Sequence, residues 1–138
     1  MLLAFDPGEP AAQRKHAPRA SHATWALLAG AVRTFCAQGI THAIAEASLN
    51  SPERFEAGER SANGEPAFIY VMHDGVLYRL VPTGMLGCGR YHGFPETMKG
   101  LADKLTEKEQ RALLSWAEQH GHRRALASWL RSTKDWTR

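Results

Sequence analysis

The most site-like part of the chain is a glycine-rich segment at residues 83–93. Glycines permit tight turns and allow the backbone to approach a ligand closely. A cysteine acts as a nucleophile when a general base lies within hydrogen-bond reach. The segment therefore predicts a small hydrolase or transferase with Cys88 as the nucleophile and His92 as the base, and with Arg90 and Tyr91 as binding residues.

The same segment also has a structural interpretation, as a loop that links a β-hairpin to the C-terminal helices. It lacks the Cys-x5-Arg pattern of phosphatase loops and the Gly-Lys-Ser/Thr pattern of nucleotide-binding P-loops. A base for a catalytic cysteine usually comes from elsewhere in the chain. The sequence leaves both interpretations open.

Positive charge gathers at the C-terminal end of a chain whose formal net charge is +3. Arg124 and Arg131 are seven residues apart and therefore share one face of a helix, and aromatic residues lie nearby. Basic side chains with aromatics suit phosphate contact and base stacking. Our leading prediction is a small binding protein that contacts nucleic acid or an acidic protein partner through Arg123, Arg124, Arg131, Lys134 and Trp136.

A plainer interpretation of this end is a solvated helix face. The arginines then favour the C-terminus of the helix through its dipole, and Trp129 belongs to the core.

Two acidic residues suggest a third, weaker alternative. Residues 2–8, Leu-Leu-Ala-Phe-Asp-Pro-Gly, resemble the first strand of RuvC-type, RNase H-like nucleases. The resemblance implies that Asp6 and Glu46 share metal ions for phosphodiester hydrolysis. The chain departs from that family because it lacks room for the usual hairpin between the two acids and has no convincing third acid near the C-terminus. A plain Asp-Pro-Gly turn explains the same residues.

The sequence gives no signature of a metal site or cofactor. Its seven histidines and two cysteines show no ligand spacing, and a zinc site needs at least three converging ligands. The apolar run before Asp6 and Pro7 is too short for a signal peptide or a membrane span. We therefore predict a cytoplasmic protein with no membrane contact, no cofactor and free thiols at Cys36 and Cys88.

In the N-terminal half the pattern predicts a short strand at residues 2–5, followed by a helix from Ser21 to a cap at Gly39. Trp25, Leu28 and Val32 would lie on one face of that helix. Residues 40–47 fit a strand or a helix, with the strand preferred. Asn50, with Glu53 three residues later, then predicts the start of a short polar helix that ends before residue 63.

In the C-terminal half Asp74-Gly75 predicts a type I′ hairpin over residues 67–81, with Tyr70 and Tyr78 on or near one face. Three helices follow, the first from Pro95 to about residue 104. The second opens with a capping box at residues 106–109, and the third runs from about 122 to 132.

These elements predict a single α+β domain over residues 1–138. It has a small mixed sheet, made of the N-terminal strand and the hairpin 67–81, packed against helices, with a helical C-terminal third. The length is sufficient for one hydrophobic core. A composition of 43% hydrophobic and 22% charged residues is ordinary for a globular protein and argues against disorder.

Overall fold

A computed structural model describes residues 3–5, 24–28, 31–35 and 47–135 of the chain, and it confirms the predicted α+β class. A helical turn spans residues 47–49. The other elements are β1 (Ala4–Phe5), β2 (Thr24–Leu28), β3 (Ala31–Phe35), β4 (Phe55–Arg60), β5 (Pro66–His73), β6 (Val76–Pro82), β7 (Arg90–Pro95), α2 (Met98–Lys104), α3 (Glu107–Gln119) and α4 (Arg123–Ser132).

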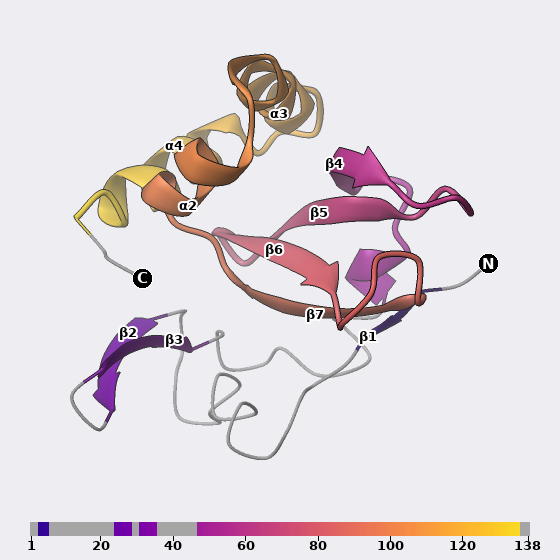
Figure 1. The fold of residues 1–138 in the computed structure, drawn as a ribbon. Coiled ribbons are helices and arrows are strands. Elements are labelled where there is room, and N and C mark those ends of the chain that lie inside the picture. The colour runs from indigo at the N-terminus through magenta and orange to yellow at the C-terminus, as the bar shows by residue number, and fades with distance from the viewer. Residues whose placement is uncertain (1–2, 6–23, 29–30, 36–46, 136–138) are drawn as a thin grey trace.

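The main sheet has the strand order β1-β7-β6-β5-β4. Strands β4 to β7 pair in antiparallel fashion, and β1 joins β7 in parallel, so the sheet is mixed as predicted. Helices α2, α3 and α4 gather on one side of it (Figure 1). Residues 76–80 of the central strand β6 are all buried, which shows that both faces of the sheet are covered there.

The predicted hairpin is present as β5 and β6. Asp74 and Gly75 have φ values of 51° and 77°, as a type I′ turn requires. The turn sets Tyr70 opposite Arg79 and Val71 opposite Tyr78. The prediction that Tyr70 and Tyr78 share a face is therefore wrong, because side chains alternate along a strand and a register change of one residue reverses the face.

The helix predicted from Ser21 to Gly39 is also wrong. Its described residues form β2 and β3, which pair in antiparallel fashion with Leu28 opposite Ala31. The apolar spacing fitted a helix, but both segments also contain the aromatic and β-branched residues that strands favour. A link of two residues lets them pair locally. Residues 40–46, predicted as a strand, lie outside the described residues.

The short helix predicted from Asn50 is replaced by a turn and strand β4. The side chain of Asn50 pairs with the backbone of Leu3, accepting its N–H at 2.8 Å and donating to its carbonyl at 2.9 Å. Ser51 Oγ accepts the N–H of Glu53 at 3.1 Å, but no helix follows. The next residues pair instead with β5, starting with Phe55 opposite Tyr70. A distant partner therefore overrides the local helix signal.

The three C-terminal helices are confirmed. Thr97 caps α2, so Pro95 ends β7 and does not open the helix. Thr106 and Glu109 form the predicted capping box of α3. The hydrogen bonds from the backbone N–H groups of Thr106 and of Gly58 in β4 lower the pKa of Glu109. One carboxylate thus connects the start of α3 to the sheet.

Strand β4 contains an irregularity at Gly58. The register with β5 shifts between Ala57 and Arg60, and Gly58 has a φ of 81°. A Cβ atom placed there would lie 2.9 Å from a ring carbon of Phe68. The position therefore requires glycine for its backbone conformation and for its close contact.

A buried ion pair lies at the centre of the helix-facing side of the sheet. Arg79 Nε is 3.1 Å from Glu96 Oε2, and the two residues are 3% and 0% exposed. The Arg79 guanidinium lies over the rings of Phe94, at 4.8 Å, and Phe68, at 5.6 Å. Its Nη1 has no hydrogen-bond partner in the described part of the chain. The two rings and Glu96 therefore stabilise this charge.

Glu96 also connects the sheet to the helices. Its backbone N–H donates to Leu77 of β6 at 2.8 Å. Its carboxylate accepts the N–H of Thr97, the cap of α2, at 2.9 Å, and its carbonyl accepts the indole N–H of Trp129 in α4 at 2.7 Å. The residue that neutralises Arg79 is therefore the one on which two helices are anchored.

The Gly58 contact predicts unequal effects of two alanine substitutions. We expect Gly58→Ala to lower the free energy of unfolding by roughly 1–3 kcal/mol more than Gly64→Ala. Both glycines have positive φ, but a Cβ at Gly64 would meet nothing within 4 Å. Urea denaturation of the two variants measures the difference. Equal losses of stability in the two variants would show that the contact with Phe68 does not restrict position 58.

The buried ion pair predicts strong coupling between its two members. We expect Arg79→Met to destabilise the fold by about 3–5 kcal/mol, because it leaves the Glu96 carboxylate buried without its cation. The double variant Arg79→Met with Glu96→Gln removes both charges, so its loss should be clearly smaller than the sum of the single losses. Chemical denaturation of all four proteins tests this. Additive losses would contradict the coupling.

Candidate functional site

The outward face of α4 and the turn after it carry the C-terminal basic residues that the sequence predicted for binding. Arg123, Arg124, Arg131 and Lys134 are all exposed, and the helix contains no acidic residue. Arg123 pairs with Glu118 at 3.0 Å. The other three cations have no ion-pair partner among the described residues. The small exposed residues 127 and 128, alanine and serine, lie between them.

The inward face of α4 fixes this orientation. Leu126 and Trp129 are 0% and 8% exposed, and the Trp129 indole donates to Glu96. Trp129 is thus a core residue, as the plainer interpretation of the sequence held. Trp136, the aromatic residue predicted to bind, lies outside the described residues.

The glycine-rich segment is half loop and half strand. Residues 83–89 form the loop, whereas Arg90, Tyr91 and His92 belong to β7. Arg90 is exposed, but Tyr91 is fully buried and donates its hydroxyl to the carbonyl of Pro66 at 2.6 Å. Burial, with the nearby charge of Glu65, raises the pKa of Tyr91 to about 12. Tyr91 therefore does not project from the loop as expected.

The two predicted catalytic side chains, Cys88 and His92, are both connected to Thr83. Cys88 is an exposed free cysteine whose thiol donates to the carbonyls of Thr83 and Arg90 at 3.3 and 3.4 Å. Nδ1 of His92 lies 3.1 Å from the hydroxyl of Thr83. Neither hydrogen bond of the thiol reaches His92, whereas a nucleophilic cysteine needs its base in direct reach.

A buried carboxylate that sequence reasoning missed holds this loop in place. Glu65 is 6% exposed and accepts the N–H of Gly89 at 2.7 Å and the side-chain amide of Asn63 at 2.9 Å. Asn63 also donates to the carbonyl of Gly87 at 3.3 Å. The loop is thus tied to the β4–β5 turn. The sequence predicted a helix that ends before residue 63, but it did not show that this turn contacts a loop more than twenty residues away.

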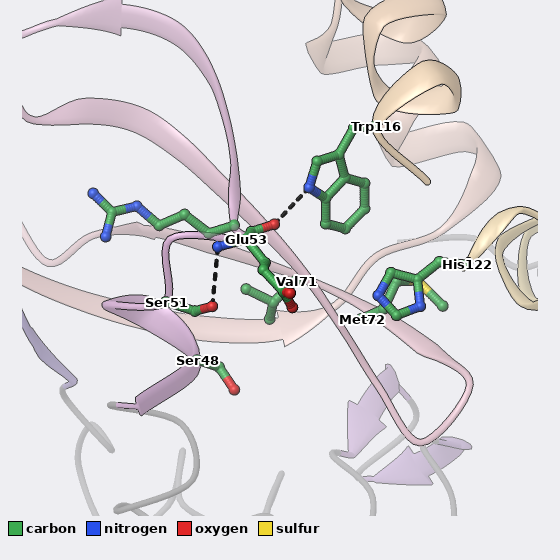
Figure 2. A pocket seen from close by; sticks show the side chains of 8 residues that line it. Ser48, Ser51, Glu53, Val71, Met72, Trp116 and His122 are labelled. Carbon is green, nitrogen blue, oxygen red and sulfur yellow. Dashed lines mark hydrogen bonds between the residues drawn. The ribbon is translucent and has the colours of Figure 1, made fainter. Parts of the chain in front are cut away.

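A depression of about 160 Å³ lies at the end of the sheet near the start of β4. We call it the Glu53 pocket. Its polar lining comes from Ser48, Ser51, Glu53 and Arg54, and its apolar and aromatic lining from Val71, Met72, Trp116 and His122 (Figure 2). Sequence reasoning did not find it, because these residues come from segments that only the fold brings together.

The metal-dependent alternative concerns residues that the structure does not describe. Asp6 and Glu46 both lie outside the described ranges. Between their positions in the sequence, β2 and β3 form a hairpin, but it is a separate two-stranded sheet that does not extend the main sheet. Within residues 3–5, 24–28, 31–35 and 47–135, no three histidine, cysteine or acidic side chains gather as metal ligands. In the same part of the chain, no helix has the length and apolar character needed to cross a membrane.

Comparisons with protein-family models, with curated proteins and with solved structures find no match to this chain.

The raised pKa of Tyr91 predicts a loss of stability at alkaline pH. Tyrosine in an unfolded chain ionises near pH 10, as a rough reference value, whereas Tyr91 keeps its proton to about pH 12 in the folded state. The contribution of Tyr91 to stability is therefore fully present below the pKa of the unfolded state. It is lost as the pH rises through the pKa of the folded state. Urea denaturation across this range measures the slope.

Tyr91→Phe is the matched variant for this measurement, because it keeps the ring and removes the ionising group. We expect a shallower alkaline decline than in the parent protein. Burial also raises the pKa of Tyr70, so part of the decline should remain. Identical slopes in the two proteins would contradict the role of Tyr91.

Proposed function

We propose that this chain is a cytoplasmic binding protein that contacts nucleic acid through the outward face of α4. The observation that carries the proposal is the set of three exposed cations, Arg124, Arg131 and Lys134, without ion-pair partners among the described residues. Arg124 and Arg131 stand on α4, which contains no acidic residue and whose other face is fixed in the core by Trp129. Lys134 lies just after the end of the helix, beside the exposed Asp135. A basic face held in one orientation suits a polyanion.

The spacing of the cations supports contact with phosphates. A helix rises about 1.5 Å per residue, so Arg124 and Arg131 are separated by roughly 10 Å along the axis. This distance corresponds to about three steps of a duplex at 3.4 Å each. The small side chains of Ala127 and Ser128 between the arginines leave room for a backbone to approach the helix closely.

The character of this face favours nucleic acid over an acidic protein. Tight protein interfaces depend on aromatic or large apolar anchors that become buried at their centre. The exposed positions of α4 offer only charge, alanine and serine. Binding would then come from phosphate neutralisation and counterion release, which depend little on sequence and strongly on salt.

The test is a salt titration with a charge-reversal variant. We expect the protein to bind a labelled DNA duplex at about 50 mM salt and to lose affinity steeply as salt rises. Arg124→Glu with Arg131→Glu should weaken binding more than tenfold and lower the salt slope by roughly 2. Fluorescence anisotropy measures both quantities.

The matched control makes an equal change in net charge, but on α3. Lys108→Glu with Arg111→Glu replaces two exposed cations, so the net charge equals that of the α4 variant. We expect this control to bind within a few fold of the parent protein. Equal losses in the two variants would show that binding follows net charge and not α4. No binding of DNA or RNA at low salt, with capture of an acidic polypeptide, would favour the protein-partner alternative.

A further inference from the structure

We propose that the Glu53 pocket is a binding site for an alkylammonium group. The inference does not rest on the proposed contact of α4 with nucleic acid.

The charge of the pocket favours a cation. Two ionised residues, Glu53 and Arg54, line it. The guanidinium of Arg54 is already engaged, because it pairs with Glu56 at 2.7 Å and donates to the carbonyl of Leu49 at 2.9 Å. Glu53 is exposed, and its carboxylate has no ion-pair partner in the described part of the chain. The Glu53 carboxylate is therefore the charged group of the lining that is open to an ion-pair partner.

The backbone of Glu53 is held at both of its polar groups, which fixes the position from which its side chain extends. The indole of Trp116 donates to the carbonyl of Glu53 at 2.5 Å, and Ser51 Oγ accepts the N–H of Glu53 at 3.1 Å. Figure 2 shows the Glu53 side chain extending into the space between Ser48, Val71 and His122. Because the backbone is already held, only the side chain of Glu53 has to become ordered when a ligand binds.

The other walls suit an ammonium group on an apolar stem. The Trp116 ring packs against the ring of His122, with 5.7 Å between their centroids, and the two rings form an aromatic wall. Val71 and Met72 supply an apolar surface for carbon atoms. Ser48 and Ser51 add hydroxyl oxygens that can accept N–H hydrogen bonds.

The size of the site sets the scale of the ligand. A depression of about 160 Å³ suits a group of a few carbon atoms with one charge. A free small amine and the side chain of a lysine on a partner have this shared chemistry. An anionic ligand of the same size would meet the Glu53 carboxylate and be repelled.

The experiment follows the indole N–H resonance of Trp116 by NMR while four probes are added in turn to the full chain. We expect choline and n-butylammonium to shift this resonance saturably. We expect 3,3-dimethyl-1-butanol, the uncharged counterpart of choline, to leave it unchanged. Butyrate, which has the opposite charge, should also have no effect. Equal responses to choline and its uncharged counterpart would overturn the proposal.

Glu53→Gln tests the role of the carboxylate. It keeps the shape of an exposed side chain and should weaken ammonium binding by roughly tenfold or more. Glu59→Gln is the control, because it removes the same charge at an exposed position of β4 outside the pocket. We expect it to bind like the parent protein. Unchanged binding in Glu53→Gln, or equal losses in the two variants, would overturn the proposal.

A fifth probe, Nα-acetyl-lysine N-methylamide, distinguishes a free amine from a lysine side chain as the source of the ammonium group. Binding tighter than that of n-butylammonium would identify a lysine of a partner protein as the ligand, because the added amide groups then find contacts. Equal or weaker binding, with Glu53 still required, would identify a free amine. Both results support an ammonium site.

Discussion

The burial of the Arg79 guanidinium in the helix-facing side of the sheet is the constraint on which the rest of the arrangement depends. A charge in that position must be neutralised, and the carboxylate that does so belongs to Glu96, at the junction of β7 and α2. Glu96 also accepts the hydrogen bond that places Trp129 of α4. Charge neutralisation and helix docking therefore occur together. The outward direction of the basic face of α4 follows from an ion pair on the opposite side of that helix.

The elements that could be predicted are those whose signals lie within a few residues. Asp74-Gly75 specifies its own turn, and the capping box at Thr106 specifies the start of α3. The predictions were wrong where a contact with a segment distant in the sequence determines the secondary structure. Asn50 has the form of a helix cap, but its side chain pairs with the backbone of Leu3. The apolar residues around Trp25 and Val32 fit two periodicities, and hairpin pairing selected the strand.

The same distinction separates the two candidate sites. The cations of α4 are found from sequence because a single helix presents them, and the helical repeat alone places Arg124 and Arg131 on one face. The Glu53 pocket cannot be found in this way. Its aromatic wall, Trp116, lies more than sixty residues from Glu53 and is brought there by the packing of α3 on the sheet. Tyr91 is the opposite case. It was predicted from the sequence as a binding residue, but in the structure it is part of the core.

The bulge at Gly58 in β4 affects whether two molecules of this protein can pair through the edges of their sheets. Strand β4 forms one border of the main sheet, where unpaired backbone groups invite a strand from another molecule. The bulge at Gly58 twists that border out of a regular ladder. Beside it, burial alone would raise the pKa of Glu56, but hydrogen bonds from Arg60 and Arg54 hold it below its ordinary value. An irregular border with fixed charges is a poor template for edge-to-edge aggregation.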